Sequence, residues 1–187
     1  MIEKIATSDT CAATLQMAPG MVESVMLHGT YHVECRDDQG NLKWEAEAPN
    51  LVTTLGKNLL LNGFFDLSAQ TTIFLGLKGT GAAAIGDTMA SHAGWLEVGL
   101  ANAPVYVGTR KTPSWSAASG GTKVMSVAAS YTFSVGGVVD GCFLVVNGTS
   151  VIDNTTGVLY SAGTFGSPGA RTVAPNDVIN VIYTASA

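Results

Sequence analysis

The sequence has few charged residues and no cluster of basic ones. Only 12% of its residues are Asp, Glu, Lys or Arg, about half the share that is usual in soluble domains. The nine Lys and Arg residues are scattered along the chain, and the formal net charge is −5. Since nucleic-acid binding relies on a patch of Lys and Arg side chains, we expect no direct contact with nucleic acid.

Long apolar runs are also missing. No run approaches the roughly 20 residues that a membrane-spanning helix needs. Residues 1–16 are too polar for a signal peptide. We therefore expect a protein that is made in a cytoplasm and does not enter a membrane. Its 187 residues suffice for one domain with a sizeable core.

Cysteine and histidine are scarce, which weakens the case for metal or redox chemistry. The three cysteines, Cys11, Cys35 and Cys142, are far apart, and the chain has only three histidines. No CxxC, HExxH or related ligand spacing occurs. We expect no metal and no cofactor, and we expect Cys35 and Cys142 to be small buried hydrophobic residues in strands.

The stretch GDTMASHAGW, at residues 86–95, is distinctive because Asp87, His92 and Trp95 stand among small residues. A catalytic Asp–His pair would need a nucleophile or a metal partner. Ser91 is adjacent to His92, but it does not lie in a GxSxG context. We expect Asp87 to cap a short helical turn that ends at Gly94. Trp95 would then anchor the next segment in the core. With no other catalytic constellation in the chain, we expect a protein that is not an enzyme.

Alternating side chains predict a β-hairpin over Thr30–Ala48. Tyr31, Val33 and Cys35 alternate with polar residues, and DDQGN supplies the turn. The second strand places Leu42, Trp44, Ala46 and Ala48 on the same apolar face. One half-buried antiparallel pair is therefore predicted.

Further strands are predicted along the rest of the chain, with one helix among them. Thr53 or Thr54 can cap a helix over residues 55–65. Apolar or alternating segments at residues 72–79, 127–135, 141–148, 158–165 and 178–184 predict strands, whereas residues 99–122 look irregular. About seven or eight strands with Gly/Ser/Asn-rich connections favour a mainly β fold, an antiparallel β-sandwich or jelly-roll-like domain. We expect an N-terminal arm over residues 1–27 and a single domain over residues 28–187.

The apolar excess predicts subunit contacts. Hydrophobic residues make up 47% of the chain, so part of the surface is expected to lie against other chains. Candidate contacts are Met17 and Met21 in the arm, and Arg110 and Trp115 in the stretch 104–122. Trp115 has two interpretations, a core anchor or an aromatic side chain that packs on a neighbouring subunit.

Several segments, in a fixed order, resemble one known family. They are the hairpin YHVECRDDQGNLKWE, NLVTTLGKNLLLNGFF, IFLGLKG, DTMASHAGWLEV, and GCFLVVNGTS followed by TGVLYSAGTFGS and DVINVIYTAS. Over roughly residues 28–186 the chain resembles a family of tailed-bacteriophage virion structural proteins, which are commonly encoded among head genes. Residues 1–27 lie outside the resemblance, and Leu96 replaces a residue that is usually polar in the family.

The resemblance implies a capsid decoration (cement) protein that binds the outside of the capsid lattice and stabilises the expanded head. Its partners would be the major capsid protein and copies of itself, as a dimer or trimer, on the virion surface. A minor tail or fibre-attachment protein is the alternative. A carbohydrate-binding or hydrolytic module for the host surface is a third hypothesis, although a glycosidase would need two carboxylates that face across a cleft.

Overall fold

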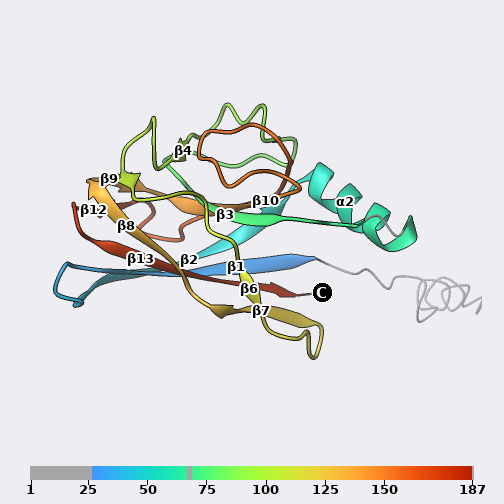
Figure 1. Cartoon of the computed structure of the whole chain (residues 1–187), viewed down its shortest axis with the longest axis horizontal. Helices are drawn as coiled ribbons and strands as arrows, with labels where there is room; N and C mark the ends of the chain where they lie inside the picture. The colour runs from blue at the N-terminus through green and yellow to red at the C-terminus, as the bar shows by residue number, and fades with distance from the viewer. Residues whose placement is uncertain (1–26, 67–68, 187) are drawn as a thin grey trace, which may run out of the picture.

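The computed structural model describes residues 27–66 and 69–186, and these form a mainly β fold (Figure 1). Over this part of the chain there are thirteen strands and one helix. The strands are β1 (His28–Arg36), β2 (Leu42–Val52), β3 (Ile73–Lys78), β4 (Glu97–Val98), β5 (Val105–Tyr106), β6 (Ser114–Trp115), β7 (Thr122–Val127), β8 (Ala129–Val135), β9 (Gly137–Val139), β10 (Gly141–Val146), β11 (Val158–Thr164), β12 (Arg171–Val173) and β13 (Val178–Ser186), and the helix is α2 (Thr54–Phe65). The predicted antiparallel β fold class is confirmed.

The predicted hairpin is the pair β1–β2, which is longer than expected at its open end. Tyr31, Val33 and Cys35 are fully buried, as their alternation predicted. Asp37 organises the turn, because its carboxylate accepts hydrogen bonds from the backbone of residues 39 and 41. Leu42 is a correction: the register shifts at Arg36, and Leu42 is exposed rather than on the buried face.

A bend in β2 converts the hairpin into a nearly closed barrel. The first part of β2 pairs with β1, and Asn50–Val52 pairs with β11, which continues through β10 to β3. Beyond β3 the backbones of Leu75 and Lys111 exchange two hydrogen bonds. β6 then pairs with β7, β7 with β13, and β13 with β1. Short β-pairings in the stretch expected to be irregular thus bridge the two halves of the sheet.

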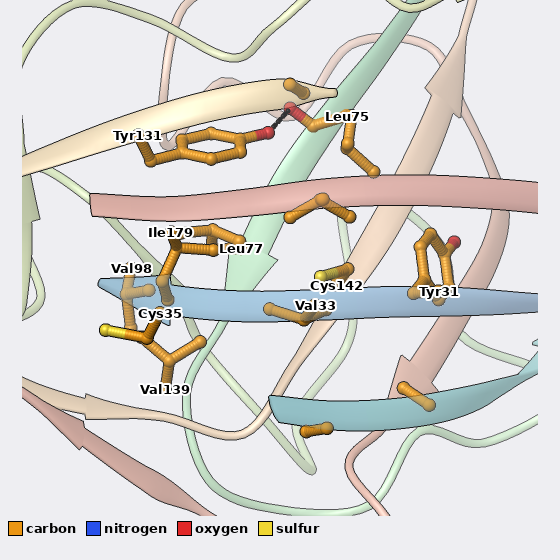
Figure 2. Close-up of a cluster of buried hydrophobic side chains, with 14 of the residues drawn as sticks. Tyr31, Val33, Cys35, Leu75, Leu77, Val98, Tyr131, Val139, Cys142 and Ile179 are labelled. Carbon is orange, nitrogen blue, oxygen red and sulfur yellow. Dashed lines mark hydrogen bonds between the residues drawn. The ribbon is translucent and has the colours of Figure 1, made fainter. Parts of the chain in front are cut away.

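The barrel interior holds the main core. Figure 2 shows Tyr131 and Leu75 on facing strands, where the Tyr131 hydroxyl donates a 2.8 Å hydrogen bond to the Leu75 carbonyl. Cys35 and Cys142 lie in this core as free thiols, which confirms their predicted role. Burial raises the pKa of the Cys35 thiol to about 12 and raises the pKa of the Cys142 thiol further. Both thiols therefore remain protonated and inert at neutral pH.

α2 begins where the sequence predicted. The hydroxyl of Thr53, the N-cap, accepts a 3.0 Å hydrogen bond from the Gly56 amide and donates to the Leu159 carbonyl in β11. The cap therefore also attaches the helix to the sheet. Gly56 permits this close packing, because a Cβ there would lie 2.3 Å from the Tyr160 carbonyl oxygen.

Candidate functional site

A layer of loops covers the outer face of β3 and β10 (Figure 1). β10 is buried on both sides: Leu144 points into the barrel core, whereas Phe143 and Val145 point outward. Met89 and Trp95, from the loop between β3 and β4, pack on these outward side chains. The second, smaller core confirms that Trp95 anchors its segment.

Asp87 plays a different role from the predicted one. No helical turn forms in residues 86–95, since Thr88 and Ser91 exchange backbone hydrogen bonds in a tight loop. The Asp87 carboxylate instead accepts 2.9 Å hydrogen bonds from the Trp95 indole N–H and from the Ala84 amide. It therefore satisfies the only polar atom of a buried tryptophan side chain, which explains its own burial.

The His92 side chain also makes its contacts within the loop, with Trp95. Its ring stacks on Trp95 with centroids 4.1 Å apart, and Nδ1 lies 3.0 Å from the Trp95 carbonyl oxygen. The polar side chains of this stretch thus bind and orient Trp95. They converge on a structural anchor rather than on a point where a reacting atom could sit.

A buried lysine fixes the start of the loop layer. The side chain of Lys78 is fully buried and donates hydrogen bonds to the carbonyls of Gly79 and Gly81, at 3.2 and 2.7 Å. Burial lowers the pKa of Lys78, and the Asp140 carboxylate, 3.8 Å away, opposes that shift. The ammonium group therefore ties the first residues of the loop to the barrel.

A buried ion pair holds the middle of the layer together. The Arg110 guanidinium donates to both Glu97 carboxylate oxygens, at 2.8 and 2.6 Å, and also to the carbonyls of Thr149 and Asn154. Glu97 in turn accepts from the Asp153 amide. Arg110 is 2% exposed and Glu97 4%. Arg110, a predicted subunit contact, is thus placed in the interior, where it joins three segments of one chain.

Trp115 lies at the end of the barrel. Its half-buried ring packs edge-on against Tyr183, with centroids 6.2 Å apart. It also lines an apolar pocket of about 290 Å³ between α2 and the strands β6, β7 and β13. Both interpretations of this residue remain open, because the ring contacts the core and keeps part of its surface free. Met17 and Met21, the other predicted contacts, lie outside the described residues.

An exposed leucine lies on the outer surface of the loop layer. Leu96 is 59% exposed, and its side chain separates two shallow grooves of about 180 Å³ each. Val138 of β9, 40% exposed, lines one of these grooves as well. The Leu96 carbonyl accepts a 2.8 Å hydrogen bond from the Gly79 amide, so its backbone is fixed. We call Leu96 and Val138 the apolar ridge.

Sequence reasoning did not select the apolar ridge as a site. The only signal was the leucine at a position where the resembled family is usually polar. Residue type alone does not show whether a leucine is exposed or buried. The exposure of Leu96 depends on where its neighbour Trp95 is anchored. The ridge is therefore a feature of the tertiary structure.

The described residues include neither a candidate metal site nor a helix that could span a membrane. Among residues 27–66 and 69–186, no three His, Cys, Asp or Glu side chains are grouped so that they could hold a metal ion. In the same part of the chain no helix is long and apolar enough to cross a bilayer.

No known protein-family model matches the chain, and no curated protein matches it.

Proposed function

We propose that the chain is a structural protein of a tailed-bacteriophage virion that binds the outside of the capsid lattice and stabilises the expanded head. Two lines of support are independent of each other. The first is the ordered set of segments that resembles the phage family. The second is a charge-poor β domain with apolar side chains displayed on an internally braced layer of loops.

The apolar ridge is the observation that carries the proposal. Apolar side chains held on a rigid support lose little conformational entropy when they are buried against a partner. Leu96 and Val138 meet this condition, because Trp95 and Val139, which are buried, adjoin them in the chain. Apolar anchors at the centre of an interface commonly provide much of its binding energy.

The proposed mechanism is mechanical. Packaged DNA strains the contacts between capsid subunits, and a bound domain that spans such a contact adds interface area. A stable interface buries about 800 Å² on each partner. Simultaneous contact with several capsid subunits multiplies the affinity, and a dimer or trimer of the chain would match a symmetry axis of the shell.

Copy number tests the proposal most directly. In a quantitative gel of intact particles that contain this chain, we expect a copy number comparable to that of the major capsid protein. A copy number typical of one tail ring or one set of fibres would overturn the proposal and would indicate the tail alternative.

Substitution of the apolar ridge should weaken binding to expanded capsid shells. Burial of a leucine side chain is worth about 1.5–3 kcal/mol, so we expect L96S to reduce the affinity about tenfold or more, and L96S/V138S to reduce it further. V127S, on β7 at the other side of the barrel (Figure 1), is the matched control, since Val127 is 65% exposed. Equal affinities of L96S and V127S in a cosedimentation assay would exclude the ridge as the contact.

A further inference from the structure

The apolar pocket at the end of the barrel is an open part of the main core. Its floor includes the buried residues Leu144 and Tyr183, and its walls include Leu59, Ile73, Trp115 and Tyr160. We call it the barrel mouth. An apolar cavity of about 150 Å³ accommodates a benzene molecule, so the roughly 290 Å³ of the barrel mouth corresponds to about two apolar side chains. Such a hollow left open to water forfeits the free energy of burying its walls.

The chain enters the fold at the rim of the barrel mouth. His28, the first residue of β1, pairs with Ser186 at the end of β13, next to Ala185, which lines the mouth. The start of β1, the end of β13 and α2 lie at the same end of the barrel (Figure 1). Residues 1–26 are therefore attached within a few residues of an apolar hollow, and the exposed Leu27 continues them to β1.

The residues next to this attachment point are apolar. Met21, Val22, Val25 and Met26 precede Leu27 closely, and Pro19-Gly20 allows a reversal of the chain before them. A span of six residues reaches at most about 20 Å, so these side chains stay near the mouth whatever path they take. Tethering at this range gives an effective concentration in the millimolar range, which favours them over a segment of a second molecule.

We propose that residues 21–26 fold back over the barrel mouth of their own chain and insert apolar side chains among Leu59, Trp115 and Tyr183. The segment would complete the main core and shield Trp115 from water. This docking does not depend on a role in the virion, because it concerns the isolated chain.

Cysteine trapping and dye binding test the proposal in the full-length chain. In a C11S background, V25C/K123C would join the segment to the exposed Lys123 position on the rim, while Cys35 and Cys142 are buried. We expect an intrachain disulfide at every protein concentration.

Dye binding and fluorescence quenching provide a second test. M21S/M26S should increase the binding of an apolar fluorescent dye severalfold and increase the quenching of tryptophan fluorescence by iodide. I2S/I5S, with the same change farther from the attachment point, should leave both signals at the wild-type level.

Each other result would overturn the proposal. Disulfide-linked dimers, or mixed disulfides when V25C and K123C are on separate molecules, would show that a second copy fills the mouth. Failure to form any disulfide, together with equal dye binding by wild type and M21S/M26S, would show that the mouth stays open. Circular dichroism of each variant distinguishes dye binding at the mouth from dye binding to unfolded chains.

Discussion

Replacement of Arg110 by methionine is expected to destabilise the protein by about 3–5 kcal/mol, the usual cost of removing one partner of a buried ion pair. R110M would leave the Glu97 carboxylate buried, with the Asp153 amide as its remaining donor among the described residues. It would also leave the carbonyls of Thr149 and Asn154 without the Arg110 guanidinium. E97Q should cost a similar amount, since it leaves the guanidinium charge unbalanced. Urea denaturation followed by circular dichroism measures both losses.

The surface pair Arg36–Glu34 supplies a matched control. It has the same two-pronged geometry, with nitrogen–oxygen distances of 3.1 and 3.0 Å, but it lies in solvent, where ion pairs contribute little. R36M should therefore lose far less stability than R110M. A double variant R110M/E97L, which removes both charges, should recover part of the loss. If R110M and R36M were equally stable, the buried pair would not be what holds the loop layer together.

Local elements of the fold could be predicted because their signals are local. Alternation over Tyr31, Val33 and Cys35 predicted β1, and Thr53 at the start of an apolar stripe predicted α2. Closure of the barrel could not be predicted in this way. It depends on a bend that divides β2 between two partners and on two-residue strands such as β6, too short to produce any periodicity.

The side-chain partners of the loop layer were beyond sequence reasoning for a related reason. Asp87 lies eight residues from the indole that it binds, and Arg110 lies thirteen residues from Glu97. A local capping rule therefore predicted a helix cap for Asp87, and the enrichment of arginine at interfaces predicted a subunit contact for Arg110. Scarcity of charge was the available signal: in a chain that is only 12% charged, an arginine and a glutamate between apolar segments are candidates for a buried pair.

Gly81 is expected to be the least replaceable glycine of the loop layer. Its φ of +112° is unfavourable for any residue with a Cβ, and that Cβ would lie 1.9 Å from the Gly94 carbonyl oxygen. Strain costs about 1–3 kcal/mol and overpacking another 1–3 kcal/mol, so G81A should lose about 2–6 kcal/mol. The clash would push apart the two ends of the loop that Lys78 and Trp95 anchor.

Two other glycines separate the contributions. At Gly40 φ is +85° and a Cβ would meet nothing within 4 Å, so G40A reports backbone strain alone. At Gly86 a Cβ also meets nothing, and φ is not in the left-handed region, so G86A should be nearly neutral. The expected order of destabilisation in urea is G81A, then G40A, then G86A.

If the loop layer supports the apolar ridge, G81A should also weaken capsid binding under conditions where the barrel remains folded, because Leu96 lies on the displaced side of the clash. If G81A matched G86A in both stability and capsid affinity, the clash at Gly81 would neither destabilise the fold nor disturb the apolar ridge.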